Sequence, residues 1–185
     1  MSQRESGDLD SELLSQAAKG DRKSFGAFYE RFIGELYRYV YLRIGDHEEA
    51  EDLTETVFLK AWEALTGESK DQRIRNIRAW IYRIAHNTVV DHYRARKNTV
   101  SIDETLDKSL RSTWLEREVD DAIISQKMAK GIMQLPSIDQ RVIILRFVNQ
   151  MSHAEVAQIL QVREGHVRVL QYRALKRLRN LLSEI

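Results

Sequence analysis

The sequence predicts an all-α protein in which two small helical domains are joined by a linker. Proline occurs once and glycine eight times among 185 residues, so residues that interrupt helices are scarce. Apolar residues make up 43% of the chain, and they recur at spacings of three and four. The sequence has no runs of alternating β-branched residues, which disfavours strands. Amphipathic helices are therefore expected along most of the chain.

The first domain is expected to span residues 1–97. A short helix is predicted over about 11–19, and the Gly-Asp pair at 20–21 interrupts the chain after it. A second helix is predicted over about 24–44, with Gly45 just past its end, where glycine is common. The apolar positions of this helix fall on one face: Phe25, Phe28, Phe32, Leu36 and Val40.

A third helix is predicted from Asp46, as N-cap with Glu49 at the capping-box position, to about Leu65. A polar, basic loop over 66–76 follows it, and a fourth helix then runs to about Lys97. That helix has an apolar face for burial and an opposite face that is polar and positively charged. The apolar face holds Ile77, Ile81, Ile84, Ala85, Thr88 and His92, and the opposite face Arg83, Asn87, Val90, Arg94 and Lys97.

Residues 98–118 are expected to form the linker, because their charge is dense and their periodicity weak. The second domain then spans 119–185 and opens with a helix over about 119–134, which Pro136 ends. Ser137 with Gln140 has the pattern of a second capping box, opening a helix through Ile143 and Phe147.

Ser152 with Glu155 has the pattern of a third capping box, opening a short helix to Leu160. A turn over 161–164 leads to the last helix, over about 165–182. The buried stripe of this helix is predicted to hold Val167, Leu170, Ala174, Leu178 and Leu181.

Composition excludes several classes of protein. The sequence has no cysteine, which rules out structural disulfides and thiolate metal sites. The first ten residues are polar and acidic, unlike a secretory signal, and no apolar run approaches membrane-spanning length. A cytoplasmic protein with no membrane insertion is expected.

Charge is distributed in blocks although the net charge is only +1. Residues 45–63 hold seven acidic residues, and residues 70–97 hold eight basic ones. Residues 101–121 are acidic again, and residues 163–179 hold six basic residues. Such blocks favour separate surfaces for separate partners. The plain alternative for each block is a solvated helix face.

The C-terminal pattern predicts a DNA-binding helix-turn-helix. A short capped helix, a tight turn and a longer basic helix occur in the order that this motif requires. The second helix of such a motif lies in the major groove and needs long polar side chains opposite its buried stripe. Arg168, Tyr172, Lys176 and Arg179 lie there, with Arg173 at the flank. An amphipathic helix with a solvated basic face is the alternative.

Residues 70–97 combine basic side chains with Trp80, Tyr82 and Tyr93. Single-strand binding needs both aromatic rings for stacking and cations for the backbone. Asn87 lies among arginines on the polar face, and its amide can bond a base edge. We expect Trp80 to be at least partly buried, because tryptophan in a helix is more often a core residue than a stacking platform.

The acidic third helix favours a protein-docking face. Its carboxylates lack a histidine at metal-site spacing, because His47 and Glu48 are adjacent and point in different directions. Apolar positions at Leu53, Val57 and Leu59 interrupt the charges, as in a docking surface. No cofactor is expected, and no nucleophile, base and orienting group form a catalytic set.

Several strings in the sequence resemble the sigma-70 family of transcription initiation factors. The strings "AEDLTETVFLKAW" (50–62) and "RAWIYRIAHNTVVDHYRARK" (78–97) resemble region 2 of that family. The strings "LPSIDQRVIILRF", "MSHAEVAQILQVREGHVRV" and "YRALKRLRNLL" within 135–182 resemble region 4. The short linker resembles the extracytoplasmic function subgroup.

This resemblance implies three binding surfaces. Core RNA polymerase, through its β and β′ subunits, is expected to contact Asp52, Leu53, Glu55, Thr56, Phe58 and Leu59. The minus-ten element, including a flipped base and the melted non-template strand, is expected to contact Arg73, Arg75, Trp80, Arg83, Asn87 and Arg94. The duplex minus-thirty-five element is expected to contact Arg163, His166, Arg168, Val169, Tyr172, Arg173 and Lys176.

The resemblance also implies an anti-sigma partner and a non-enzymatic role in promoter recognition and melting. The sequence departs from the family pattern in two places: Glu55-Thr56-Val57 stands where Gln-Glu-Thr is common, and His166 stands where a small hydroxyl residue is common. Two other functions stay open at this point. One is a stand-alone helix-turn-helix regulator, and the other is a protein that occupies polymerase without binding DNA.

Overall fold

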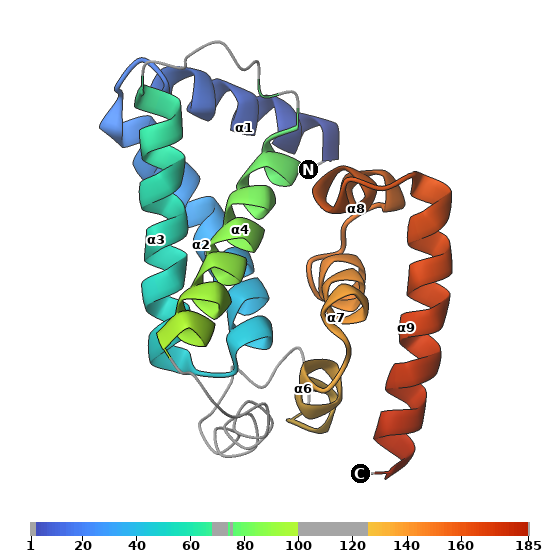
Figure 1. Cartoon of the computed structure of the whole chain (residues 1–185). Helices are drawn as coiled ribbons and strands as arrows, with labels where there is room; N and C mark the ends of the chain where they lie inside the picture. The colour runs from blue at the N-terminus through green and yellow to red at the C-terminus, as the bar shows by residue number, and fades with distance from the viewer. Residues whose placement is uncertain (1–2, 68–73, 75, 100–125, 185) are drawn as a thin grey trace.

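The computed structural model describes residues 3–67, 74, 76–99 and 126–184, and every regular element in these ranges is helical (Figure 1). The N-terminal elements are α1 (Gln3–Ala17), α2 (Arg22–Ile44), α3 (His47–Thr66) and α4 (Ile77–Thr99). The C-terminal elements are α6 (Gln126–Met133), α7 (Ser137–Ile143), the π-helical turn η1 (Ile144–Val148), α8 (His153–Leu160) and α9 (Glu164–Glu184). Among the described residues, no helix is both long and apolar enough to cross a membrane.

The boundary between α2 and α3 follows the sequence signals. Gly45 adopts the left-handed conformation with φ of 83°, and its N–H donates to the Tyr41 carbonyl at 2.8 Å. Asp46 then caps α3 by accepting from the Glu49 N–H at 2.9 Å. The Glu49 carboxylate bonds Arg96 of α4 at 3.1 Å instead of returning to the cap, so only half of the predicted capping box forms.

One predicted helix start and one predicted helix cap are wrong. The first helix begins at Gln3 rather than near residue 11. The capping box predicted for α7 does not form, since Pro136 is the N-cap and makes no side-chain bond. Gln140 is instead buried, and its Nε2 donates to the Leu42 carbonyl at 2.8 Å. The side chain that the sequence pattern assigned to a local cap therefore bonds α2 instead.

The apolar face predicted for α2 is confirmed. Phe28, Phe32, Leu36 and Val40 are buried, and Phe25 packs at the edge of the core. Phe28 packs edge-on against Phe58 of α3, and Phe25 packs edge-on against Trp62. These aromatic pairs hold α2 and α3 side by side, as Figure 1 shows.

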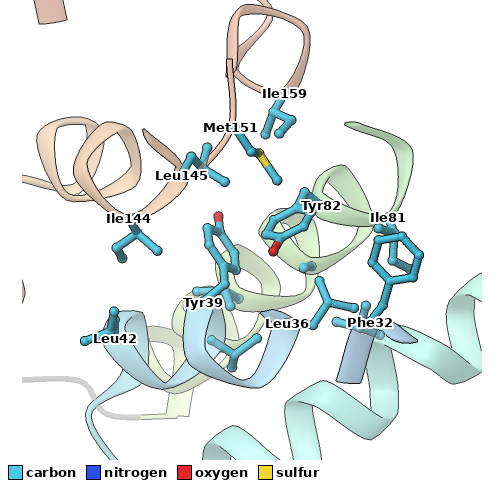
Figure 2. Close-up of a cluster of buried hydrophobic side chains, with 14 of the residues drawn as sticks. Phe32, Leu36, Tyr39, Leu42, Ile81, Tyr82, Ile144, Leu145, Met151 and Ile159 are labelled. Atoms are coloured by element: carbon cyan, nitrogen blue, oxygen red, sulfur yellow. The ribbon is translucent and has the colours of Figure 1, made fainter. Parts of the chain in front are cut away.

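One buried core spans both halves of the chain. Figure 2 shows Tyr39 of α2 and Tyr82 of α4 facing Leu145 and Met151 of the C-terminal half, with Leu36 of α2 in the same buried cluster. The helices of the C-terminal half that carry this contact are mainly η1 and α8. α9 packs on α6, α7 and α8, on the side away from α1–α4 (Figure 1). The outer face of α9 is therefore left open to solvent.

Candidate nucleic-acid and polymerase interfaces

The C-terminal candidate site is a helix-turn-helix built from α8 and α9. Ser152 and Glu155 form the predicted reciprocal capping box at the start of α8, with N–H to oxygen distances of 3.2 Å and 2.8 Å. Gln161 ends α8 in the left-handed conformation with φ of 56°. α9 begins at Glu164, so the connection is a tight turn. The structure thus has the geometry that the sequence pattern predicted.

The face of α9 opposite its buried stripe is exposed and both basic and apolar. Val167, Leu170, Ala174 and Leu178 form the buried stripe. Tyr172 is 73% exposed, and Val169 lies exposed on the same side. His166, Arg168 and Lys176 are exposed as well, as is Arg163 in the preceding turn. An uncovered face of this kind can enter a DNA groove, since apolar groups contact thymine methyls and arginines bond guanine or phosphate.

Two arginines of α9 are held by partners within the protein. Arg168 bonds Glu164 one turn earlier at 2.8 Å, an exposed pair that water weakens. Arg173 lies 3.5 Å from Oδ1 of Asp139 on α7, whose carboxylate is fully buried. Arg177 bonds the other oxygen of the same carboxylate. Sequence reasoning missed both Asp139 and Arg177, because a contact between α7 and α9 leaves no periodic signal.

The second candidate site is the outer face of α4. Arg83, Asn87 and Arg94 are exposed on it, as the helical spacing predicted. Trp80 is partly buried and packs against the core, which confirms the expectation for its ring. Arg94 lies 3.9 Å from Asp91, and Lys60 of α3 lies 3.6 Å from the same carboxylate.

Both of these pairs are exposed, so they leave the cations available to a stronger anion such as phosphate. The predicted contacts Arg73 and Arg75 lie outside the described residues.

The third candidate site is the outer face of α3. Leu59 is 59% exposed, and Asp52 and Glu55 are exposed near it. Leu53 is half-buried, and Thr56 donates its hydroxyl to the Asp52 carbonyl at 2.9 Å. Phe58 is different, because it is 3% exposed and packs against Phe28 and Tyr29. Phe58 therefore supports the helix from the core side and adds nothing to the exposed face.

The acidic residues of α3 do not converge on a metal centre. In the ranges that the structure describes, no three His, Cys, Asp or Glu side chains are grouped so that they could hold a metal ion. The His47 ring packs at a tilt against Tyr41 with 4.4 Å between ring centroids, and its Nδ1 bonds the Tyr37 hydroxyl at 2.6 Å. Burial and nearby carboxylates raise the pKa of Tyr37 to about 12, so this hydroxyl stays protonated. His47 therefore acts as a packing residue.

The helix-turn-helix, the basic, polar face of α4 and the acidic, apolar face of α3 together define a DNA-binding transcription factor with a protein-docking surface. Family comparisons identify the class more closely. Residues 28–99 match sigma-70 region 2, and residues 131–180 match sigma-70 region 4. The chain belongs to the sigma-70 family and is an RNA polymerase sigma factor, which directs polymerase to promoters.

Similar proteins place the chain in the extracytoplasmic function (ECF) subgroup. It is 32% identical to the ECF sigma factor BldN of Streptomyces coelicolor over 177 residues, covering 94% of this chain and 66% of BldN. It is 27% identical to the ECF sigma factor SigW of Bacillus subtilis over 182 residues, covering 93% of this chain and 96% of SigW.

Solved structures agree on the fold. CnrH, solved in complex with the cytosolic domain of CnrY, matches with a TM-score of 0.70 at 25% identity, covering 95% of this chain and 98% of CnrH. RpoE of Bartonella quintana, solved with the anti-sigma factor NepR, matches with a TM-score of 0.69 at 22% identity, covering 87% of this chain and 98% of RpoE.

Proposed function

We propose that this sigma factor docks on core polymerase through α3, binds the melted minus-ten element through α4 and binds the minus-thirty-five duplex through α9. The observation that carries the proposal is the placement of exposed basic faces on two different helices, each backed by a buried apolar stripe. Two DNA faces with different chemistry suit two DNA elements in different states.

The face of α3 suits a protein partner. Leu59 projects an apolar side chain from a surface that also carries Asp52 and Glu55. An exposed apolar residue ringed by charges is typical of a docking site with a fixed register. We assign this face to core polymerase and its β and β′ subunits, with Phe58 acting from the core side.

The face of α4 suits unpaired bases. Asn87 offers an amide with both donors and acceptors, and Arg83 and Arg94 offer cations for the strand backbone. Holding the non-template strand single favours the melted state without any catalytic group, because binding shifts the equilibrium toward the open duplex. The proposed role is therefore promoter recognition and melting by binding alone.

The face of α9 suits duplex DNA. Arg168 can bond guanine, and Tyr172 and Val169 can contact thymine methyl groups in the major groove. His166 lies exposed in the first turn, where such helices contact bases. These side chains are proposed to set the preferred minus-thirty-five sequence.

The two DNA elements lie farther apart than the packed protein can reach. Centres 25 base pairs apart are separated by about 85 Å at about 3.4 Å per base pair. A compact chain of this length has a radius of gyration of about 16 Å. We propose that the two halves, residues 1–97 and 119–185, separate on the promoter. The linker 98–118 can span up to about 70 Å when extended.

A regulatory partner is also proposed. CnrH was solved in complex with CnrY, and RpoE with an anti-sigma factor. By analogy, we propose that this chain has an anti-sigma partner that restrains it until a signal arrives. Its place of action is the cytoplasm, where polymerase and promoters are found.

Run-off transcription with purified core polymerase on genomic DNA fragments tests the proposal. Core alone and core with this protein are compared, and discrete new start sites are expected only with the protein. Asn87→Ala and Arg168→Ala should weaken these starts, whereas Glu30→Ala, on an exposed part of α2, should not. Binding to core without new transcripts would refute promoter recognition, and no binding to core would refute the docking role of α3.

A further inference from the structure

We propose that Arg173 and Arg177 form a phosphate-binding subsite at the edge of α9 and that the buried carboxylate of Asp139 orients both guanidinium groups. This inference rests on the proposed function, in which α9 lies on duplex DNA. It adds Arg177 as a DNA contact, and Asp139 as a positioning residue that does not itself touch DNA.

The geometry is that of one carboxylate shared by two arginines. Asp139 lies in the first turn of α7, and its side chain is 0% exposed. Oδ1 lies 3.5 Å from Nη2 of Arg173, and Oδ2 bonds Nη1 of Arg177. The arginines are four residues apart, so they lie one above the other on the same edge of α9.

The charges do not balance within this cluster. Two guanidinium groups share one carboxylate, which leaves one net positive charge at the surface. Arg173 is 49% exposed and Arg177 is 46% exposed, so both side chains also reach solvent. A guanidinium carries five N–H donors, and each arginine uses only part of its donor set on Asp139. The remaining N–H groups of both arginines can therefore donate to a second anion on the solvent side.

The position of the pair on α9 selects phosphate rather than a base edge. Val169 and Tyr172 mark the middle of the exposed face, opposite the buried stripe. Arg173 and Arg177 lie at its flank beside α7, because their positions are rotated toward the buried residues Leu170 and Ala174. A helix in the major groove presents its flanks to the groove walls, which are the phosphate backbones.

Preorganisation of the two guanidinium groups gives a physical reason for a buried carboxylate that contacts both of them. Free arginine side chains lose rotamer freedom when they bind, and Asp139 has already restricted both of these. The planar fork of each group is then aimed outward with part of its donors unused. A simple tether between α7 and α9 needs only one arginine, and it predicts no dependence of DNA affinity on the second.

The salt dependence of DNA binding distinguishes a phosphate-binding subsite from a purely structural tether between α7 and α9. Holoenzyme is assembled from core polymerase and each variant, and its affinity is measured for promoter fragments with an intact or a scrambled minus-thirty-five element. Each neutralised phosphate contributes about 0.9 to the slope of log K against log salt concentration. Arg177→Ala should weaken binding to both fragments by the same factor and lower this slope by about 0.9.

Matched variants complete the test. Arg177→Lys should restore most of the slope, because lysine also holds phosphate, and Lys127→Ala, an exposed position of α6, should leave it unchanged. Asp139→Asn should give a smaller loss of affinity on both fragments, with a folded protein confirmed by circular dichroism. In the double variant with Arg177→Ala, Asp139→Asn should cause a smaller further loss of DNA affinity than it causes alone.

An unchanged slope for Arg177→Ala would overturn the inference, as would a loss confined to the intact element. Failure of the proposed function has a different signature. Wild-type holoenzyme would then fail to distinguish the intact from the scrambled element, whatever the arginine variants do.

Discussion

The two polar patches between the halves of the molecule differ in how well their charges are matched. The paired patch consists of Glu35, Arg78, Tyr82 and Asn149. Arg78 Nη2 bonds Glu35 at 2.7 Å and the Asn149 carbonyl at 2.8 Å, and Asn149 Nδ2 donates to the Tyr82 hydroxyl at 2.7 Å. Opposite charges and matched donors meet here, and within the described part of the chain only Oδ1 of Asn149 lacks a partner in this patch.

The cationic patch consists of Arg43, His86 and Arg141, about two turns further along α2. Arg43 is 4% exposed, and among the described residues its Nε and Nη1 have no hydrogen-bond partner. Arg141 Nη1 donates to Nε2 of His86 at 2.9 Å, and its own Nε has no partner. Among the described residues, no carboxylate bonds any of these three groups, and Arg43 Nη2 donates to the Ser137 hydroxyl at 3.4 Å.

Apolar burial and the paired patch therefore hold the two halves together, whereas the cationic patch works against them. A buried cation without a counter-charge destabilises the packed state, while a matched pair defines one arrangement. A contact built in this way fits the proposed separation of the two halves on a promoter.

Breaking the paired patch should have the largest effect. Arg78→Ala leaves Glu35 without its cation and the Asn149 carbonyl without its donor. We expect it to lower the free energy of unfolding by about 2 kcal/mol, less than for a fully buried pair because both side chains retain some exposure. Urea denaturation measures it. Arg94→Ala removes a more exposed charge of the same helix and should change stability by less than about 0.5 kcal/mol.

Asn149→Ala should have the next largest effect, about 1–2 kcal/mol. It removes the donor to the Tyr82 hydroxyl, which is buried and stays protonated because burial raises the pKa of Tyr82 well above its ordinary value. Asn180→Ala, at an exposed position of α9, is the control and should be nearly neutral. Equal changes in the free energy of unfolding for the two asparagine variants would show that the paired patch does not stabilise the packed protein.

Mild acid should lower the free energy of unfolding through His86 of the cationic patch, by less than either substitution in the paired patch. Burial and the neighbouring Arg141 and Arg43 lower the pKa of His86 from 6.5 to about 4. His86 is therefore neutral in the packed state, and stability is full above pH 6.5 and lost as pH falls toward 4. Between about pH 7 and pH 6 we expect a loss of about 0.5 kcal/mol. His86→Gln should remove this part of the pH dependence, and an unchanged pH profile would count against it.

Arg141→Met should have the smallest effect. It removes a half-buried cation, and burial lowers the pKa of Arg141, as expected for a charge without a counter-ion. We expect a change within about 1 kcal/mol, in the stabilising direction, because the methionine chain fills similar space without the charge. A loss as large as that of Arg78→Ala would show that both patches hold the halves together.

Periodicity predicted the parts of the fold that depend on local burial. The stripes of α2 and α9 came from spacings of three and four, and the start of α8 came from the Ser152 and Glu155 pattern. The three exposed faces followed from the same spacing. These features could be predicted because each depends on neighbours within one helix.

Contacts between helices distant in sequence could not be predicted in this way. Gln140 fitted a capping box, but it bonds a carbonyl of α2 98 residues away in sequence. Phe58 fitted the docking string, but its ring is buried under α2. Asp139 and Arg177 carried no signal at all, since a charge on a helix flank has the same pattern whether it is solvated or paired. Pairing of that kind depends on the packing of whole helices.

The proposed separation of the two halves on a promoter can be tested by a single distance. The chain has no cysteine, so Glu30→Cys on α2 and Asn180→Cys on α9 give two unique labelling sites for spin or fluorescent probes. The free protein should give one short distance, and holoenzyme on a promoter should give a distance longer by tens of ångströms. The same short distance in a transcriptionally active promoter complex would show that the two halves stay packed together on the promoter.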